Sequence, residues 1–495
     1  MAMKINCSML IGLPLIIGSL SSCKNIGSKE AEQSELKKPN IIYVLADQWR
    51  AQATGYNGDP NLIDKTPNFD RMAEQGVNFK NAISVTPVCT PYRAALLTGQ
   101  YPTTTGMIFN DLHLPEESVT MAEIFKKSGY KTGYIGKWHL DGMGRHDYTP
   151  PERRQGFDYW KALECSHDYN SLIYYEGEDS TKKQWDRYGP YAETHDAITY
   201  IQQNAGSDQP FLMVLAWGAP HFPHATAPKE FQEQFVEEDI ILRENVSDDM
   251  KEKAKKEALG YYAHIMALDK CMGELQKAMD EAGISENTIL VFTSDHGEMM
   301  GSQGVRPRQK QVPWVESVNV PFLLQYPARF KNNKIEVEAP INAPDILPTL
   351  LALADIPVPE FIEGENMSEA IGNPEVKKDK AALVMNVSPF AGKADEYRGV
   401  YTSRYSYAKT LDGPWFMFDQ KADPLQMNNL IGKPEYEDIQ KEMEIVLQQE
   451  LKKIGDDFHA RQYYIDKWGY QLTKSGHIDY SEDAKPQGPK LNSKI

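Results

Sequence analysis

The sequence predicts an α/β fold, in which a large, mostly parallel central sheet carries helices on both faces, followed by a smaller C-terminal α+β subdomain with an antiparallel sheet. Short apolar runs rich in β-branched residues alternate with helical patterns along most of the chain. Polar residues follow directly after several of these runs, which is typical of sites at the carboxyl ends of parallel strands. Near the C-terminus, aromatic residues alternate with polar ones, which favours an antiparallel sheet.

Each element has its own local signal. Short apolar runs predict buried strands at residues 40–46, 132–135, 210–217, 288–293 and 321–325. Apolar side chains at helical spacing predict helices at residues 118–128, 248–282, 340–354 and 435–454. The alternation of aromatic and polar residues at 398–418 predicts the small antiparallel sheet.

Length and composition set the class of protein. A chain of 495 residues is too long for one ordinary core, so we expect a main domain at 39–380, a C-terminal subdomain at 381–480 and a tail with little to bury at 481–495. Lys and Arg total 53 against 70 for Asp and Glu, and the net charge of −17 argues against nucleic-acid binding. An anionic ligand stays compatible with this balance, because a site needs only a few local cations.

The N-terminus predicts export from the cytoplasm. Residues 1–22 contain an apolar run at 9–20 that suits a signal peptide and is too short to span a bilayer. The Leu-Ser-Ser-Cys segment that ends at Cys23 is similar to a bacterial lipobox, which implies a lipid anchor on Cys23 and a location in the periplasm or at the outer membrane or cell surface. Residues 23–38 are polar and form a predicted tether. A plain signal peptide with an incidental cysteine, or a short buried helix, is the alternative.

The most specific motif lies at residues 89–99, which read CTPYRAALLTG. The C-x-P-x-R pattern followed by T-G resembles the signature of type I formylglycine-dependent sulfatases of the alkaline phosphatase superfamily, and the resemblance extends from about residue 39 to 430. It implies that a formylglycine-generating or anaerobic sulfatase-maturating enzyme oxidises Cys89 to an aldehyde, whose hydrate attacks sulfur and then releases sulfate. Tyr92 departs from the usual serine. A small buried cysteine is the structural alternative.

The resemblance also implies a metal site. Asp47 and Gln48 end the first predicted strand, and Asp295 and His296 follow the strand at 288–293. Together with the oxygen derived from Cys89, they would bind one divalent cation, for which an oxygen-rich set favours Ca²⁺. His296 stands where many relatives have Asn, so Mn or Zn stays open. The Asp-Gln pair also occurs in a branch that includes phosphonate monoesterases.

Further cations and imidazoles match family motifs. Lys137 and His139, in the sequence GKWH, would contact the sulfate and the formylglycine hydroxyl. His221, in PHFPH, would protonate the departing alkoxide, with Asp295 as a rival for that role. Lys310 would be a second sulfate cation. Arg93 would hold the formylglycine and the metal-bound carboxylates.

Residues outside these motifs are weaker candidates for substrate binding. Such side chains bind sugar hydroxyls or a uronate carboxylate, and each could equally be surface charge. The candidates are Asn110, His113, Arg306 and Arg308, with Arg145, His146, Asp147, His167 and Asp168 as further sugar contacts.

The sequence therefore predicts a sulfuric ester hydrolase that removes sulfate from a sulfated carbohydrate. An exported enzyme meets polymers and their fragments, and the resemblance implies a glycosaminoglycan or mucin-type glycan as the substrate. The resemblance also implies attack at the end of the glycan, because the family's usual pocket favours a terminal sulfated sugar. A phosphonate or phosphodiester hydrolase of the same superfamily is the alternative enzyme. An inactive glycan-binding lipoprotein is the alternative from another class.

Overall fold

The computed structural model describes residues 37–373, 375–390, 394–479, 481 and 483–489. The predicted signal peptide at 1–22, Cys23 and residues 24–36 of the predicted tether lie outside these described residues. Within the described ranges, no helix combines the length and the hydrophobicity needed to cross a membrane.

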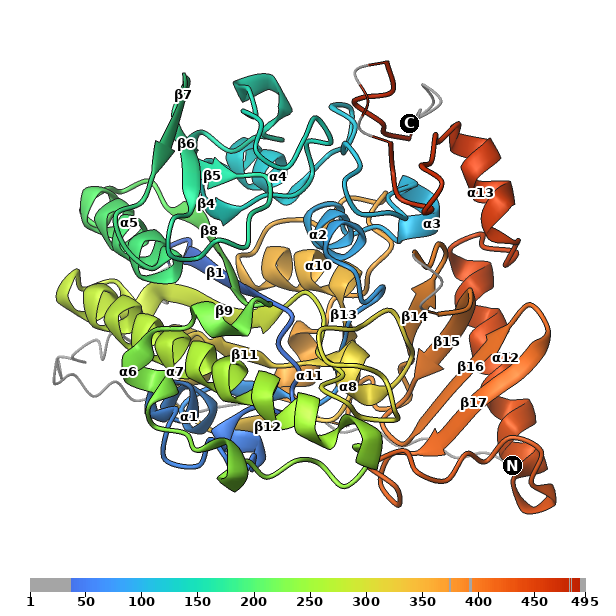
Figure 1. Cartoon of the computed structure of the whole chain (residues 1–495). Coiled ribbons are helices and arrows are strands. Elements are labelled where there is room, and N and C mark those ends of the chain that lie inside the picture. The colour runs from blue at the N-terminus through green and yellow to red at the C-terminus, as the bar shows by residue number, and fades with distance from the viewer. Residues whose placement is uncertain (1–36, 374, 391–393, 480, 482, 490–495) are drawn as a thin grey trace, which may run out of the picture. The chain divides into compact units, whose positions relative to one another are not determined.

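A ten-stranded sheet forms the centre of the fold (Figure 1). In spatial order its strands are β12 (Ile335–Val337), β2 (Val77–Phe79), β11 (Phe322–Gln325), β9 (Thr288–Ser294), β1 (Asn40–Asp47), β8 (Phe211–Pro220), β4 (Lys131–Lys137), β5 (Tyr159–Leu163), β6 (Ile173–Glu176) and β7 (Asp179–Gln184). The pairs from β9 through β1, β8 and β4 to β5 are parallel. The five predicted strands are confirmed as β1, β4, β8, β9 and β11. β11 runs antiparallel to β9, a direction that an apolar run does not encode.

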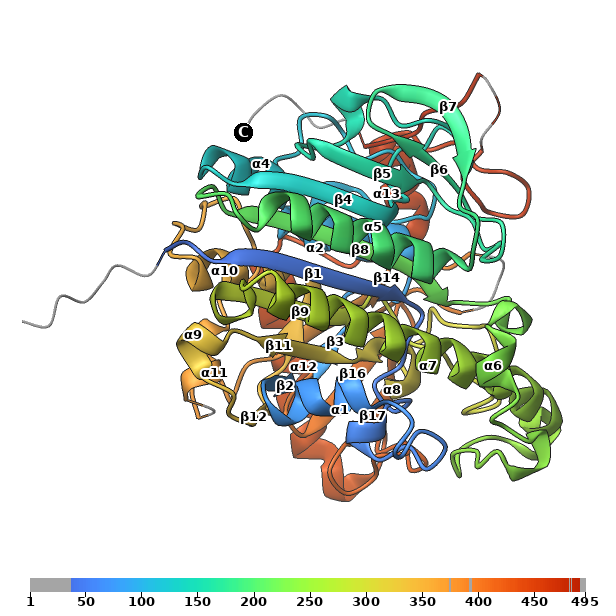
Figure 2. The same ribbon diagram turned by 90° about the vertical axis from the view of Figure 1, so that its left-hand side faces the viewer.

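Helices cover both faces of this sheet. They are α1 (Pro67–Glu74), α2 (Cys89–Thr98), α3 (Pro102–Thr105), α4 (Met121–Lys127), α5 (Gly189–Asn204), α6 (Lys229–Gln232), α7 (Lys251–Glu281), α8 (Val315–Val318), α9 (Pro327–Phe330), α10 (Ala343–Leu353) and α11 (Ser368–Gly372). Alternate residues of β1, from Ile41 to Leu45, pack with α2, α4 and α10, and those from Ile42 to Ala46 pack with α1, α5 and α7. Figure 2 shows α5 and α7 lying across the second face.

The ends of the helices follow capping chemistry. The helix predicted at 118–128 begins at Met121, because Thr120 and Glu123 form a capping box. α2 is a helix that the periodicity does not predict, since every residue from Cys89 to Thr98 is buried and no polar face marks it. It ends at Gly99, whose φ of 68° is readily adopted by glycine.

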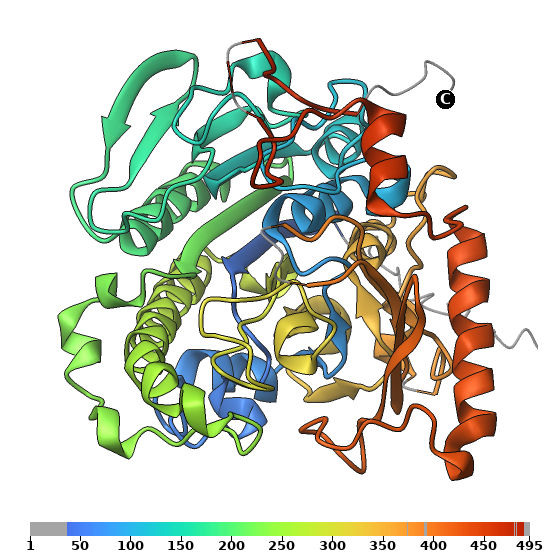
Figure 3. The same ribbon diagram turned by 45° about the vertical axis from the view of Figure 1, so that its right-hand side comes forward.

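The C-terminal part is a four-stranded antiparallel sheet with two helices (Figure 3). Its elements are β14 (Ala382–Asn386), β15 (Tyr397–Tyr401), β16 (Tyr405–Thr410), β17 (Gly413–Asp419), α12 (Glu437–Lys453) and α13 (Arg461–Trp468). β15 to β17 confirm the sheet predicted at 398–418, whereas β14 is short and uniformly buried and has no alternation to reveal it. A three-stranded sheet of β10 (Asn319–Val320), β3 (Ala82–Ile83) and β13 (Ile341–Asn342) adjoins it, and the Met385 N–H donates to the Val85 carbonyl over 2.8 Å.

The tail is better packed than its composition predicts. The sequence of residues 481–495 indicates little to bury, yet Gln487 is only 7% exposed. Its carbonyl accepts a hydrogen bond from the His113 N–H at 2.7 Å, and its side-chain amide donates to the carbonyls of Gln471 and Asp479 at 2.9 Å. A buried polar side chain with its own hydrogen bonds thus fixes the described segment around Gln487, which hydropathy alone does not reveal.

Candidate active site

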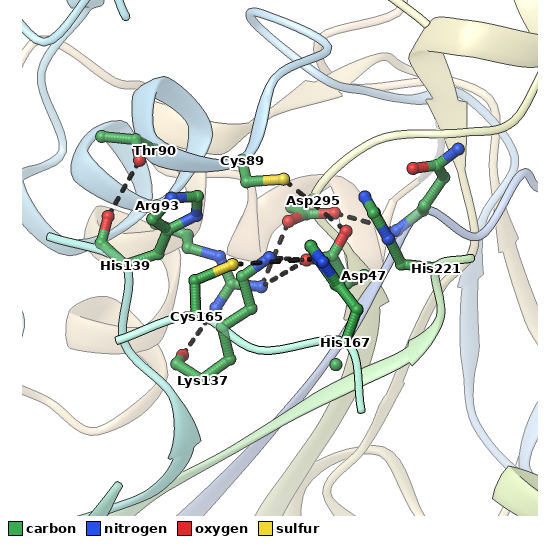
Figure 4. A network of polar contacts seen from close by, with 12 residues as sticks. Asp47, Cys89, Thr90, Arg93, Lys137, His139, Cys165, His167, His221 and Asp295 are labelled. Carbon is green, nitrogen blue, oxygen red and sulfur yellow. Dashed lines mark hydrogen bonds and ion pairs between the residues drawn. The ribbon is translucent and has the colours of Figure 1, made fainter. Parts of the chain in front are cut away.

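The carboxyl ends of the parallel strands bring the predicted site residues together (Figure 4). Asp47 ends β1 and Lys137 ends β4, while His221 and Asp295 follow directly after β8 and β9. Cys89 is the first residue of α2, which packs on the same side of the sheet as α10. Residues far apart in the chain thus meet at one edge, as expected for an open parallel sheet.

Cys89 lies at the centre of this cluster and is 1% exposed. Its Sγ is 3.2 Å from His296 Nε2, 3.7 Å from Asp47 Oδ1 and 3.8 Å from Lys310 Nζ. Sγ therefore lies between two side chains that could bind a metal, Asp47 and His296, and the ammonium group of Lys310. A nucleophilic oxygen at this position would therefore face both a metal and an anion-binding group.

Two buried carboxylates are neutralised by buried cations. Arg93 Nη2 is 3.4 Å from Asp47 Oδ2 and 3.1 Å from Asp295 Oδ2, and Lys137 Nζ is 2.5 Å from Asp47 Oδ2. Burial by itself would raise the pKa of Asp47, but the attraction of Lys137 and the neighbouring positive groups holds it well below its ordinary value. The site therefore keeps Asp47 ionised and ready to bind a cation.

The donor set fits a divalent cation. One ligand atom each from Asp47, Cys89, Asp295 and His296 lie within 4.8 Å of one another, and all four residues are buried. Two carboxylates and an imidazole are suitable ligands for such an ion, whose charge would stabilise developing negative charge on a substrate. Gln48 donates its backbone N–H to Asp295 Oδ1 over 3.1 Å, and its side-chain oxygen accepts from Lys310 Nζ at 2.8 Å.

His139 is fixed by a carboxylate that no sequence motif marks. Its Nε2 lies 2.7 Å from Asp111 Oδ1, and its carbonyl accepts from Thr90 Oγ1 at 2.9 Å. His139 Nδ1 is buried and has no hydrogen-bond partner among the described residues. With Nε2–H donated to Asp111, Nδ1 is left as an acceptor. Asp111 follows Asn110 in a loop, and it is a residue of the candidate site that the sequence did not predict.

His221 stacks on His167 in the same cavity. Their ring centroids are 4.2 Å apart with an interplanar angle of 7°. His221 Nδ1 lies 2.8 Å from the Phe222 carbonyl, so this nitrogen is the donor and Nε2 is the acceptor. Burial, together with the charge of Lys310, lowers the pKa of His221 well below its ordinary value. The imidazole is therefore neutral at neutral pH in the state that the structure shows.

A cavity of about 140 Å³ opens onto Cys89. Nine of the candidate residues line it, namely Cys89, Asn110, Lys137, His139, Arg145, His167, His221, Arg308 and Lys310. His113 and Arg306 do not line it: His113 Nδ1 lies 3.2 Å from the Asp141 carbonyl, and the Arg306 side chain is exposed. A larger cavity of about 560 Å³ contains none of the predicted site residues, so size alone does not mark the site.

Five lining residues were not predicted as site residues, namely Cys165, Phe222, Gln309, Gln311 and Phe390. Cys165 follows β5, Phe222 follows His221 in the motif already noted, and Phe390 follows β14. Asn110, a predicted substrate contact, accepts the Thr90 N–H at 2.9 Å and so supports the first turn of α2. An isolated aromatic or thiol side chain belongs to no motif with a fixed spacing, so the sequence does not identify it as a lining residue.

Comparisons with known proteins agree with this geometry. A model of the sulfatase family matches residues 39–356, and a model described as N-sulphoglucosamine sulphohydrolase, C-terminal, matches residues 308–453. The chain is 52% identical to an ulvan-active sulfatase of Formosa agariphila, over 96% of this chain and 93% of the relative. It is 29% identical to an endo-4-O-sulfatase of Bacteroides thetaiotaomicron, over 89% of this chain and 96% of the relative.

Solved structures show the same fold. The crystal structure of YidJ from Bacteroides fragilis superimposes with a TM-score of 0.78 at 29% identity, covering 87% of this chain and 99% of that one. A protein in complex with its substrate D-glucosamine-2-N,6-O-disulfate gives a TM-score of 0.72 at 26% identity, covering 85% of this chain and 99% of that one. With the match of the family model over most of the chain, these findings confirm the resemblance seen in the sequence. The chain belongs to the sulfatase family and is a hydrolase of sulfate esters.

Proposed function

We propose that this sulfatase removes sulfate from a sulfated polysaccharide or its oligosaccharides, with Cys89 converted to formylglycine as the nucleophile. The observation that carries the proposal is the position of Cys89 Sγ, at the edge of the cavity and within 3.8 Å of Asp47, His296 and Lys310. An oxygen in place of this sulfur would lie between the cation ligands and a group that binds sulfate.

The residues around Cys89 divide into two sets in this proposal. Asp47, Gln48, Asp295 and His296 would hold one Ca²⁺ together with the converted Cys89, and the four buried ligands of the cluster support that assignment. Lys137, Lys310 and Arg93 would neutralise the sulfate and the carboxylates, and His139 would accept a proton through Nδ1. His221 or Asp295 would protonate the leaving alkoxide, and His221, which is neutral in the structure, would first have to gain that proton when the anionic substrate binds.

The relatives support a choice of substrate. The ulvan-active sulfatase at 52% identity favours ulvan fragments as the substrate of this chain, ahead of the glycosaminoglycan or mucin glycans that the sequence alone suggested. The cavity of about 140 Å³ is small, which supports attack on a sulfated sugar at the end of a chain. One relative is named as an endo-4-O-sulfatase, so the experiment compares desulfation of terminal and internal sugars directly.

The compartment and partners belong to the same proposal. A lipid on Cys23 would anchor the enzyme in the periplasm or at the cell surface, where polysaccharide fragments are available. Cys23 lies outside the described residues, so the lipobox pattern alone supports the anchor. A formylglycine-generating or anaerobic sulfatase-maturating enzyme would be the required partner.

The test uses the full chain co-expressed with a maturation enzyme. Tryptic mass spectrometry should find the peptide containing Cys89 lighter by about 18 Da, since CH2SH becomes CHO. The matured protein should desulfate ulvan oligosaccharides, and Cys89→Ala should abolish turnover. Cys271→Ala, which trims a buried thiol within α7, is the matched control and should keep activity per folded molecule.

Three results would contradict the proposal. Full activity with an unmodified thiol at Cys89 would exclude the nucleophile. Equal desulfation of internal and terminal sugars would exclude the end-specific mode. Turnover of phosphonate esters with none of any sulfate ester, measured per mole of formylglycine, would favour the phosphonate hydrolase instead.

A further inference from the structure

Two arginines line the catalytic cavity without belonging to the set that contacts Cys89 or the carboxylates of the proposed metal site. Arg145 lies in the loop after β4, and Arg308 lies in the loop after β9. Their side chains are 45% and 44% exposed, so each guanidinium faces both the protein and the solvent. Their location places two fixed positive groups on the wall where the rest of a substrate would lie.

Arg145 is oriented by the carboxylate that also holds His139. Its Nε and Nη2 donate to the two oxygens of Asp111 over 3.0 and 2.9 Å, while His139 Nε2 lies 2.7 Å from Asp111 Oδ1. This bidentate geometry fixes the plane of the guanidinium. Among the described residues, no hydrogen bond involves Nη1 of Arg145, so donors remain for a ligand.

Arg308 repeats the arrangement. Its Nε and Nη2 donate to the two oxygens of Glu257 over 3.0 and 2.7 Å, and His224 Nδ1 lies 2.7 Å from Glu257 Oε2. The guanidinium carbon lies 5.4 Å from the ring centroid of Phe222, another lining residue. The described part of the chain gives Arg308 Nη1 no hydrogen bond either. Two His–carboxylate–Arg units therefore each present one arginine to the cavity.

The charge balance of the site suggests what these arginines bind. A sulfate ester carries a single negative charge, and Lys137 and Lys310 already face the position of Cys89 and its neighbours. Arg145 and Arg308 are each paired with a carboxylate, so they add directed N–H donors to the wall more than they add net charge. These donors exceed what one sulfate needs, and N–H groups of a guanidinium suit a further anionic group.

Resting on the proposed function, we propose that Arg145 and Arg308 bind a second anionic group of the substrate, a carboxylate or a further sulfate on the same oligosaccharide. The site thereby selects polyanionic sugars over neutral sugars that carry one sulfate. Asp111 and Glu257 are positioning residues in this proposal, because they act through the arginines that they hold.

A third unit of the same kind supplies the matched control. Arg153 donates Nε and Nη2 to Asp141 over 2.5 and 3.1 Å, and His113 Nδ1 lies 4.0 Å from the same carboxylate. None of these three residues lines the cavity. Arg153→Gln therefore removes an arginine with the same geometry and leaves the proposed recognition wall intact.

The test compares Arg145→Gln, Arg308→Gln and Arg153→Gln in the matured full-length protein. Four substrates are used: a sulfated disaccharide with a uronate, its carboxyl-reduced form, a disaccharide with two sulfates and no carboxylate, and 4-nitrophenyl sulfate. Removing either cavity arginine should raise KM about tenfold or more for the substrates with a second anion, the loss expected for a hydrogen bond to a charged group. The ratio of kcat/KM for the substrates with a second anion to kcat/KM for 4-nitrophenyl sulfate should therefore fall about tenfold in both variants, whereas every constant of Arg153→Gln should stay unchanged.

The two anionic disaccharides distinguish a carboxylate from a second sulfate as the preferred group. Equal losses on all four substrates would assign the arginines a structural role and overturn the proposal, and so would an unchanged KM for both anionic disaccharides. Failure of the proposed function is a separate result, namely no desulfation of any substrate by the wild-type protein. In that case, calorimetric binding of the same disaccharides to Cys89→Ala, with and without Arg145→Gln, still decides whether the arginine recognises the second anion.

Discussion

Asp111→Asn should reduce kcat for 4-nitrophenyl sulfate by about 10–100-fold. The Asp111 side chain is 9% exposed and accepts three hydrogen bonds, one from His139 and two from Arg145. Asparagine keeps the shape but loses the charge, so its amide cannot hold His139 in one tautomer as firmly. A hydrogen bond to a charged group is worth about 1.5–3 kcal/mol, which corresponds to this range of rates if it is lost in the transition state.

The loss should persist across the working pH range. Burial would raise the pKa of Asp111, but hydrogen bonds from His139 and Arg145 hold it well below its ordinary value. The native carboxylate therefore stays charged from acid to alkaline pH, and its stabilising contribution disappears only as the pH falls below the ordinary range of aspartate.

The control is Asp141→Asn, which removes the carboxylate of the unit outside the cavity. The assay follows nitrophenol release and is normalised to formylglycine content by mass spectrometry and to folded protein by thermal denaturation. An unchanged kcat in Asp111→Asn would refute the reasoning. So would an equal loss of kcat in Asp141→Asn, because the effect would then not depend on His139.

Three further predictions concern stability. Burial raises the pKa of Glu164 to about 8, against about 4.3 in an unfolded chain, so the free energy of unfolding should fall as the pH rises between these values. Glu164→Gln should therefore have a higher Tm than the wild type at pH 8. An equal Tm would contradict this. Chelation should lower Tm, and excess Ca²⁺ should restore it. Ca²⁺ at a thousand times its Kd should add about 4 kcal/mol to the free energy of unfolding, and Asp47→Asn should abolish this response in the same denaturation assay. Arg398→Ala, which leaves the carboxylate of Asp456 buried without its ion-pair partner, should cost about 3–5 kcal/mol in urea denaturation, and the exposed Arg404→Ala should cost clearly less.

Local patterns are sufficient for the residues that follow strands. Asp47, Lys137, His221 and Asp295 each come at or after an apolar run, and parallel strands share a carboxyl edge, so the sequence predicts that these four side chains lie together. Cys89 is identified by its motif, because burial along the whole of α2 removes the amphipathic period that would mark a helix.

Long-range pairings could not be predicted in the same way. Asp111 and Glu257 orient arginines that are 34 and 51 residues away in the chain, and nothing in the composition of either segment marks a partner at that distance. The antiparallel direction of β11 and the buried Gln487 have the same cause. Each depends on which segments meet in space and not on its own sequence.

The burial of Cys89 also imposes an order on the biogenesis of the enzyme. Only 1% of this residue is exposed, and it lies in a cavity of about 140 Å³, which has no room for the active site of another protein. In the proposed maturation, the enzyme that oxidises the thiol would therefore have to reach it while residues 89–99 are still an open chain. Once α2 has packed against α10, another protein could no longer reach the thiol of Cys89. Under the proposed maturation, a chain that folds before it is oxidised would keep an unmodified thiol at Cys89, and the rate of folding would then compete with the rate of maturation.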